Sequence, residues 1–395
     1  MKYPQTGLLV IQPTPFCNIN CSYCYLPHRS SKNTLSFERA EIIFKKALRF
    51  PTVRGSLTVV WHAGEPLVLP VSYYEQMFEL IRGLTPPGLT IRHSFQTNGT
   101  LISDAWCDLI TRWDLNIGVS IDGPRELHDL YRKQRNGAGS FDRTYEGLRK
   151  LQHAGIPFHV ISVLTVESMA QPEKLFEFYV ENELDYICFN IEEQEGTNVD
   201  SKLVGTGNSD VRYRAFLQRF LDLALQCQRP LLVREVEHSM RMIHAHGAPV
   251  CNDQNEPFGI ISIDCDGNLS TFSPELLGLE HERYGSFCFG NLVEDNFEEI
   301  AARLYKSTLY ADVTGGVRQC ADTCDYYGLC GGGAPSNKIF ENGSAATTET
   351  AHCRTFMRSV DVVLDLIERL PNDLRAALAA GQTRVGAPAM SMWPG

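Results

Sequence analysis

The chain has 395 residues, of which 43% are hydrophobic and 21% are charged. This balance is typical of a soluble globular protein and excludes a disordered one, and the length suggests two or three structural units. The chain has 36 Lys and Arg and 47 Asp and Glu, which gives a formal net charge of −11. Since no run of basic residues offsets this negative charge, we do not expect the protein to bind nucleic acid.

Short β-type runs alternate with helical patterns from residue 7 to about residue 226. The expected strands cover residues 7–12, 56–62, 90–97, 115–121, 157–166 and 185–191. The expected helices that follow them cover residues 37–48, 72–84, 103–112, 142–154, 172–182 and 210–226. Six such repeats predict a parallel α/β sheet that is too short for a closed eight-fold barrel, so we expect a partial (β/α)6 TIM barrel over residues 1–229 with its active site at the C-terminal strand ends.

Regular periodicity fades after about residue 232, where Gly, Asn, Asp and Cys become frequent. We expect a second unit over residues 230–358, a helical segment over 359–383, with helices at 359–370 and 372–380, and a flexible tail over 384–395.

No apolar run reaches the length of about 18 residues that a membrane helix needs, and the first residues do not form a signal peptide. We therefore expect a cytoplasmic protein without a membrane partner. In a reducing compartment, the 13 cysteines favour metal binding or redox chemistry over disulfides.

Three cysteines lie close together after the first strand. Cys17, Cys21 and Cys24 have a C-x3-C-x2-C spacing. Three thiolates on one loop can ligate three irons of a [4Fe–4S] cluster and leave the fourth iron open. A zinc site completed by His28 is the alternative.

This loop, C-x3-C-x-aromatic-C, resembles the signature of the radical S-adenosylmethionine (SAM) enzymes. The resemblance extends over roughly residues 7 to 355. It implies that the open iron chelates SAM, and that reductive cleavage of SAM gives a 5′-deoxyadenosyl radical that abstracts a hydrogen atom. It also implies a low-potential electron donor such as a flavodoxin or ferredoxin.

Motifs at successive strand ends match the same family. The segment WHAGEP, at residues 61–66, resembles its GGEP motif with Ala63 in place of a glycine, which implies that Gly64 and Glu65 receive the SAM ammonium. QTNG and SIDG, which end the next two strands, imply contacts to the methionine and ribose, while HDLYR supplies an arginine for the SAM carboxylate. The implied SAM-binding residues are Tyr23, Gly64, Glu65, Asn98, Ser120, Asp122, Arg132 and Leu164.

Simpler explanations exist for some of these residues. The alternative role for Arg132 is an ordinary ion pair, and the alternative for Leu164, expected beside adenine, is a core leucine. Asn and Asp before Gly also favour turns on their own account.

A second set of cysteines lies near the C-terminus. Cys320, Cys324, Cys330 and Cys353 supply four thiolates, the number that a fully ligated iron–sulfur cluster takes, although a structural zinc would use the same residues. The arrangement resembles the SPASM extension of peptide-modifying radical SAM enzymes, which usually holds two auxiliary clusters.

The chain departs from that pattern in the auxiliary ligands. Ala334 and Phe272 stand where two cysteines are expected. We therefore predict one auxiliary [4Fe–4S] cluster, while a second site built from Cys251, Cys265 and Cys288 is the alternative. The remaining cysteines, Cys107, Cys188 and Cys227, are expected to be ordinary buried residues.

The resemblance implies a precursor peptide as substrate and leaves several reactions open. Loss of auxiliary ligands and the segment FSPELLG, at residues 272–278, favour the cyclophane-forming RiPP maturases of the glycine-rich-repeat (GRRM) type, which join a β-carbon to an aromatic ring. Anaerobic sulfatase-maturing enzymes use an aspartate where this chain has Ser273. Thioether formation and β-hydroxylation are further alternatives on the same scaffold.

Ring coupling requires a base, and Asp264 and Glu275 are the candidates. The alternative for both residues is that they are solvated acidic residues of turns without a catalytic role. A non-enzymatic, zinc-stabilised binding module is the remaining hypothesis. Motifs at four successive strand ends speak against it, because a binding module does not need them.

Overall fold

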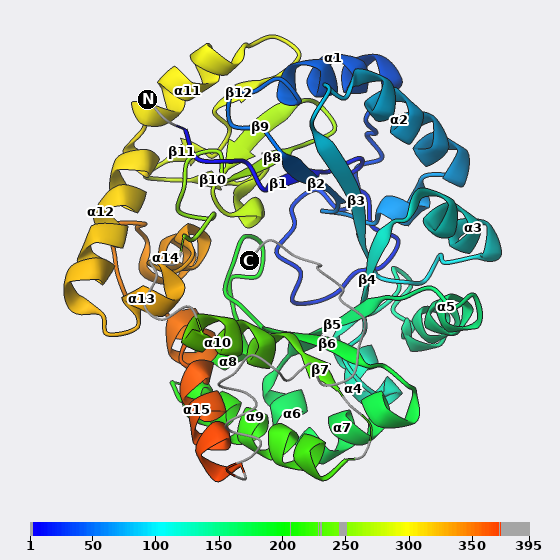
Figure 1. Cartoon of the computed structure of the whole chain (residues 1–395), viewed down its shortest axis with the longest axis vertical. Helices are drawn as coiled ribbons and strands as arrows, with labels where there is room; N and C mark the ends of the chain where they lie inside the picture. The colour runs from blue at the N-terminus through cyan, green and yellow to red at the C-terminus, as the bar shows by residue number, and fades with distance from the viewer. Residues whose placement is uncertain are drawn as a thin grey trace.

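A curved, mostly parallel sheet organises the molecule. The computed structural model describes residues 3–205, 207–227, 229, 231–244, 251–370 and 372. Among these residues ten strands form one sheet in the order β12-β9-β8-β1-β2-β3-β4-β5-β6-β7. Figure 1 shows the strands curving around the middle of the molecule with the helices arranged in a ring outside them.

The six predicted strand–helix repeats are confirmed as a parallel α/β sheet. Its strands are β1 (Leu8–Ile11), β2 (Ser56–Trp61), β3 (Thr90–Thr97), β4 (Asn116–Ser120), β5 (His159–Leu164) and β6 (Tyr186–Ile191). The helices predicted between and after them are α1 (Phe37–Ala47), α2 (Val71–Leu84), α3 (Asp104–Trp113), α5 (Phe141–His153), α7 (Pro172–Glu181) and α9 (Ser209–Gln226). Shorter helices, α4 (Arg125–Tyr131), α6 (Val166–Met169) and α8 (Lys202–Gly205), lie at the strand ends.

Local sequence explains where these helices begin. Ser36 accepts a hydrogen bond from the amide of Arg39 and so caps α1, as expected for a serine before an apolar helical pattern. Thr165 and Ser168 form a reciprocal capping box at α6. Ser103 is the N-cap of α3 with extended backbone, but its side chain makes no capping hydrogen bond.

The sheet continues past both ends of the predicted repeats. β8 (Ile260–Ile263) pairs in parallel with β1, and β9 (Asn268–Thr271) follows it antiparallel, with β12 (Gly290–Asn291) at the edge. On the other side β7 (Leu232–Val233) pairs with β6. The sheet therefore crosses residue 229, where the sequence suggests a boundary between units, and that division stays a prediction.

The C-terminal half is mainly helical. Its helices are α10 (Arg234–His244), α11 (Phe297–Tyr305), α12 (Thr308–Thr323), α13 (Tyr327–Cys330), α14 (Pro335–Asn342) and α15 (Ser359–Arg369). Short elements complete it: β10 (Glu280–His281), β11 (Gly285–Ser286), the 3-10 turns η1 (Pro66–Val68) and η2 (Pro274–Leu276), and the π-helical turn η3 (Cys353–Met357). In Figure 1, α12 to α14 occupy the side of the ring between α11 and α10.

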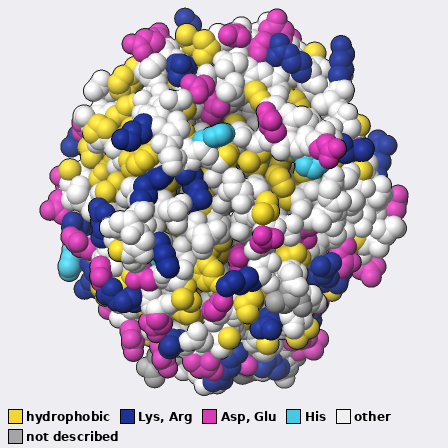
Figure 2. Space-filling view, turned by 180° about the vertical axis from the view of Figure 1, so that it is seen from behind, with side chains coloured by type: hydrophobic (Ala, Val, Ile, Leu, Met, Phe, Trp, Pro, Cys, Tyr) yellow, Lys and Arg dark blue, Asp and Glu magenta, His cyan; other side chains and the backbone are white. Residues whose placement is uncertain are grey.

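The predicted helix over 359–370 is confirmed by α15. The predicted helix over 372–380 and the tail over 384–395 lie outside the described residues, apart from Asn372. In the part of the chain that is described, no helix is long and apolar enough to cross a membrane. Figure 2 shows acidic and basic side chains interspersed over the face opposite the view of Figure 1.

Aromatic side chains between the first strands and helices form much of the core. Trp61 of β2 is fully buried and packs against Tyr74 and Phe78 of α2 and Phe95 of β3. Such large buried rings contribute both apolar area and favourable edge contacts. They fix the positions of the strands whose C-terminal ends carry the site.

Candidate functional site

The first cysteine loop follows β1. Burial raises the pKa of the Cys17 and Cys21 thiols to about 12, and mutual repulsion among Cys17, Cys21 and Cys24 contributes to this. The three thiols therefore lie close enough to influence one another, as predicted from their spacing. Buried thiols give up their protons only if a cation compensates the charge, which is what binding of iron provides.

A tight turn after β2 is attached to this loop. The amide of Glu65 donates to the carbonyl of Phe16 over 2.8 Å. Gly64 has a φ of +125°, and a Cβ there would lie 2.3 Å from the carbonyl oxygen of Thr14. The turn thus needs glycine both for its conformation and for its close approach to the cysteine loop.

Glu65 is buried at the base of this turn. Its carboxylate accepts hydrogen bonds from the Thr97 hydroxyl (2.7 Å) and from the amides of Asn98 (2.8 Å) and Leu67 (3.0 Å). Burial raises the pKa of Glu65 to about 7, against the effect of these donors. Glu65 also lies near Cys17, whose pKa it raises, so the turn and the thiols share one site.

The end of β3 contacts the same loop. The Asn98 side-chain amide donates to Asn18 Oδ1 over 2.8 Å and lies 3.8 Å from Cys17 Sγ. An amide beside a ligand sulfur is a common means of orienting it. Asn98 is therefore placed beside a predicted cluster ligand, and its contact to SAM stays a prediction.

Arg132 has a different partner from the one that the resemblance implies. Its guanidinium pairs with Asp122, Nε with Oδ2 at 2.9 Å and Nη2 with Oδ1 at 3.0 Å. Both side chains are buried, and the Tyr23 hydroxyl also donates to Asp122. The ion pair weighed as the alternative for Arg132 is thus present, but it is buried and ties the cysteine loop to the end of β4.

Two other predicted SAM contacts lie at neighbouring strand ends. The Ser120 hydroxyl, at the end of β4, accepts a hydrogen bond from the Gln96 side chain over 3.1 Å. Leu164 ends β5 and is fully buried in the core. Their positions are compatible with a ligand at the strand ends, and their contacts to SAM remain predictions.

The second cysteine set is assembled from two helices and a π-helical turn: Cys320 and Cys324 belong to α12 and its C-cap, Cys330 to α13 and Cys353 to η3. Burial raises the pKa of Cys320 and Cys330, and the neighbouring Cys324 and Cys353 thiols raise it further. Gly333 lies so close that a Cβ there would be 3.4 Å from Cys353 Sγ. The structure therefore brings the four predicted ligands together.

Loop residues from far upstream support this second set. The Asn252 side chain donates to the carbonyls of Cys330 (3.0 Å) and Gly333 (3.1 Å), and Asn255 donates to Gly331 and Gly333. These bonds hold the glycine-rich loop in place around the thiols. Nowhere in the described residues are three His, Cys, Asp or Glu side chains spaced to hold a single metal ion.

The alternative ligands Cys251, Cys265 and Cys288 do not form a group of this kind. Burial raises the pKa of each of the three thiols, and the nearby charges that raise it further are carboxylates: Asp253 and Glu256 at Cys251, Asp266 and Asp264 at Cys265, and Asp264 and Asp295 at Cys288. Cys188 is buried within β6 and Cys107 within α3, as expected, whereas Cys227, the C-cap of α9, is only half-buried, so the expectation was wrong for it.

Three carboxylates come together where the segment after β6 meets η2, and we call Glu193, Glu195 and Glu275 the acidic group. Glu195 is buried, and Glu193 and Glu275 are half-buried. Glu193 pairs with His352, Oε1 to Nδ1 at 2.8 Å, and accepts a hydrogen bond from the Asn337 side chain over 2.9 Å. Asn337 also donates to Glu195 over 3.3 Å. Burial opposes the charge on His352, but the pairing with Glu193 raises the pKa of His352 overall.

The carboxylates of the acidic group repel one another. Burial, followed by Glu193 and Glu275, raises the pKa of Glu195 well above its usual value. Burial and the charge of Glu193 raise the pKa of Glu275 to about 7. A carboxyl with such a pKa can exchange a proton near neutral pH.

The acidic group lies between the two cysteine sets. Tyr25, directly after Cys24, is close enough to Glu275, Glu195 and Glu193 for their charges to raise its pKa, and its hydroxyl lies 3.5 Å from His62 Nε2. On the other side His352 directly precedes Cys353. Sequence reasoning identified Glu275 alone, although the EEQE run after the sixth strand is a visible signal.

The second predicted base has another role. Asp264 Oδ1 accepts from the amides of Asp266 and Asn268, both over 2.9 Å, and Oδ2 accepts from the Asn268 side chain over 2.8 Å. These bonds stabilise the turn between β8 and β9. Asp264 therefore lies in a turn, which is the alternative that the sequence left open for it.

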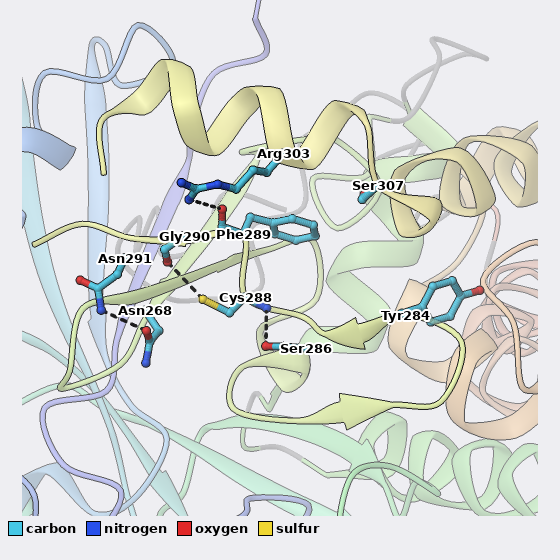
Figure 3. A pocket seen from close by; sticks show the side chains of 9 residues that line it. All are labelled: Asn268, Tyr284, Ser286, Cys288, Phe289, Gly290, Asn291, Arg303 and Ser307. Atoms are coloured by element: carbon cyan, nitrogen blue, oxygen red, sulfur yellow. Dashed lines mark hydrogen bonds between the residues drawn. The ribbon is translucent and has the colours of Figure 1, made fainter. Parts of the chain in front are cut away.

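Two surface hollows lie outside this central site. One, of about 520 Å³, includes Asn268, Cys288, Asn291 and Arg303, and Figure 3 shows Cys288 Sγ bonded to the Gly290 carbonyl within it. The other, of about 420 Å³, adjoins the cysteine loop at residues 26–31 and reaches Thr197.

Comparison with known proteins places the chain in a family. A sequence profile of the radical SAM superfamily matches residues 11–179. The chain is 43% identical over 372 residues to an uncharacterized protein of Synechocystis sp., with 93% of each chain covered. It is 25% identical over 342 residues to the serine-type anaerobic sulfatase-maturating enzyme of Bacteroides thetaiotaomicron, covering 82% of this chain and 81% of that one.

Solved structures share the fold. The structure of anSMEcpe with bound AdoMet and the Cp18Cys peptide has a TM-score of 0.74 and 20% identity, covering 96% of this chain and all of that one. SuiB of Streptococcus suis bound to precursor peptide SuiA has a TM-score of 0.59 and 19% identity, covering 89% and 76%. Both are α/β folds of the same kind. The chain belongs to the radical SAM superfamily, whose members use a [4Fe–4S] cluster and SAM.

Proposed function

We propose that this protein oxidises a side chain of a peptide substrate beside the acidic group. The observation that carries the proposal is the position of that group, which is bordered by Tyr25, next to Cys24, and by His352, next to Cys353. A substrate side chain bound beside the acidic group would then lie between the first cysteine set, which would supply the radical, and the second set, which would supply the electron acceptor. The acidic group itself would supply the proton acceptor. Structural neighbours with bound peptides support a peptide as the substrate class.

The two cysteine sets fit the cofactors. Cys17, Cys21 and Cys24 would hold the SAM-binding cluster of the partial barrel, and Cys320, Cys324, Cys330 and Cys353 would hold one auxiliary [4Fe–4S] cluster in a SPASM-type unit over residues 230–358. When bound, these groups supply the 5′-deoxyadenosyl radical that removes a hydrogen atom and an acceptor for one electron.

The chain itself supplies the proton acceptor. Oxidation of a substrate radical releases one proton together with one electron, and the Glu275 carboxylate takes the proton. Glu275 fits this role because no hydrogen bond from another described residue to its carboxylate is present, while burial holds its pKa near 7. His352 and Asn337, by binding Glu193, keep the neighbouring charge in place.

Two products are compatible with this arrangement. The first is a carbon–carbon crosslink between a β-carbon and an aromatic ring, a cyclophane. The second is two-electron oxidation of a Ser side chain to an aldehyde, or of a Cys side chain to a thioaldehyde that water converts to the aldehyde with release of hydrogen sulfide. The similarity to sulfatase-maturating enzymes favours this product. Ser273, where those enzymes are expected to have their base, donates to Gln254 and accepts from the Ser336 amide, so Glu275 two residues later would replace it.

The test is anaerobic co-expression of the protein with the short peptides encoded beside its gene, followed by mass spectrometry. A peptide that has lost two hydrogen atoms and resists fragmentation between two residues would identify a crosslink. A product that reacts with a hydrazine would identify an aldehyde. If the reconstituted protein cleaves SAM but none of the co-expressed peptides changes mass, the proposal is wrong.

A further inference from the structure

A buried lysine lies against the second cysteine set. Lys338 belongs to α14, which begins at Pro335 directly after the glycine-rich loop. Its side chain is 2% exposed, and Nζ lies 3.5 Å from Cys320 Sγ. Few lysines are buried to this extent without a partner of opposite charge.

The partner of Lys338 is the sulfur itself. Within the described residues no carboxylate forms an ion pair with Lys338. The Lys338 ammonium donates its side-chain hydrogen bond to Cys320 Sγ. Burying an ammonium beside a neutral thiol is costly, because the thiol is a weak acceptor without charge. Burial of the Lys338 ammonium becomes favourable if Cys320 is a thiolate ligand of an anionic metal centre, because the two charges are then opposite.

We propose that Lys338 raises the reduction potential of the auxiliary cluster held by Cys320, Cys324, Cys330 and Cys353. Reduction adds one negative charge to a centre that is already anionic. A fixed ammonium 3.5 Å from one ligand sulfur stabilises the reduced form more than the oxidised form, in surroundings that solvent does not screen. Lys338 is thus a positioning residue that acts through Cys320, and the inference depends on the proposed auxiliary cluster.

The consequence concerns the oxidation step. A cluster with a raised potential accepts an electron more readily, as one used to oxidise a substrate radical must. The neighbouring Asn337 binds Glu193 and Glu195 of the acidic group, so consecutive residues of α14 face that group and the proposed cluster.

The test is a redox titration of the full-length protein, followed by electron paramagnetic resonance. Cys17, Cys21 and Cys24 are replaced by Ala so that the auxiliary cluster alone is observed. In that background we compare Lys338 with K338M, which removes the charge, K338Q, which keeps a donor without charge, and K338R, which keeps the charge. K306M, an exposed lysine at the end of α11, is the matched control.

We expect K338M and K338Q to lower the reduction potential of the auxiliary cluster by about 59 mV. For one electron this shift corresponds to a tenfold change in the ratio of oxidised to reduced cluster at a given solution potential. K338R and K306M should stay close to the parent. Equal potentials in all variants with full iron content would overturn the proposal, as would zinc in place of iron and sulfide. If K338M takes up no iron, K338Q decides by the same criterion. No peptide is involved, so the outcome is independent of peptide turnover.

Discussion

Two glutamates with similarly raised pKa values have different surroundings at the residue level. Glu65 is buried, and Glu275 is half-buried. Burial raises the pKa of both Glu65 and Glu275 to about 7. Three hydrogen bonds from the turn and from β3 fix the carboxylate of Glu65, whereas the charge on Glu275 is stabilised by its own backbone amide and by the charge of His352. Glu65 is therefore suited to hold a fixed geometry and Glu275 to exchange a proton.

Replacing Glu275 by Gln should abolish peptide oxidation while SAM cleavage continues. The carboxyl group is protonated below its raised pKa and becomes a base above it, so peptide turnover by the wild type should rise with pH through about 7. Glu193, Glu195, His352 and Tyr25 surround Glu275 and broaden the transition.

The measurement is peptide product and 5′-deoxyadenosine against pH for the wild type and E275Q. E280Q, at an exposed position of β10, is the matched control and should behave like the wild type. A wild-type pH profile retained by E275Q at a normal rate would show that Glu275 is not the base.

The pair Asp122–Arg132 should contribute strongly to stability. Asp122→Ala leaves the Arg132 guanidinium buried without its carboxylate, which should lower the free energy of unfolding by about 3–5 kcal/mol. Denaturant unfolding of the protein without iron measures this directly. Asp142→Ala removes a pair of the same type, Arg125–Asp142, at the surface and should have no measurable effect. Equal effects of the two variants would contradict the distinction.

At the level of elements, the sequence was most informative where buried strands were followed by long amphipathic helices. All six strands of the repeats were predicted, because each β-type run is followed by a helical pattern. β8 and β9 were not predicted, because the regular strand–helix alternation has ended in the Gly-, Asn- and Asp-rich segment that contains them, and their place beside β1 is decided by tertiary packing.

The same contrast holds for the site. The seven cysteines could be grouped from spacing, since metal ligands impose it. The acidic group could not be predicted in this way. Glu193, Glu275 and the His352 that pairs with Glu193 come from separate segments, and their pKa values depend on their surroundings in the fold rather than on their spacing in the sequence. Likewise, the pairing of Arg132 with Asp122 depends on how α4 packs at the end of β4.

The turn after β2 provides a prediction for an element. Gly64→Ala places a Cβ 2.3 Å from the Thr14 carbonyl, so it should separate the turn from the cysteine loop and reduce iron uptake at the first site. Ala63, with a φ of +66°, already occupies a conformation that favours glycine. Ala63→Gly in the same turn should leave the unfolding free energy unchanged or raise it by up to about 1 kcal/mol.

Thermal unfolding and iron content of the two variants distinguish these expectations. Full iron content in G64A would mean that the turn and the loop can move apart without loss of the site. A clear loss of stability in A63G would show that the strain inferred at Ala63 is absent.

At the scale of the whole molecule, the central site depends on parts of the chain far apart in sequence. The first cysteine set follows β1, the acidic group combines residues after β6 with η2, and the second set belongs to the C-terminal helical segments. The pairing of β8 with β1 holds the two halves in one sheet. The two cysteine sets are nevertheless built from separate segments, so each should load with iron on its own.

Iron and sulfide content tests this independence. The reconstituted wild type should contain about eight irons, and the variant with Cys17, Cys21 and Cys24 replaced by Ala about four, because each cubane cluster holds four. Replacing Cys320, Cys324, Cys330 and Cys353 by Ala should also leave about four. The matched control replaces Cys107, Cys188 and Cys227, which lie outside both sets, and should keep the full content. About twelve irons would mean that Cys251, Cys265 and Cys288 take part in a further cluster, and zinc without sulfide would exclude iron–sulfur chemistry at either set.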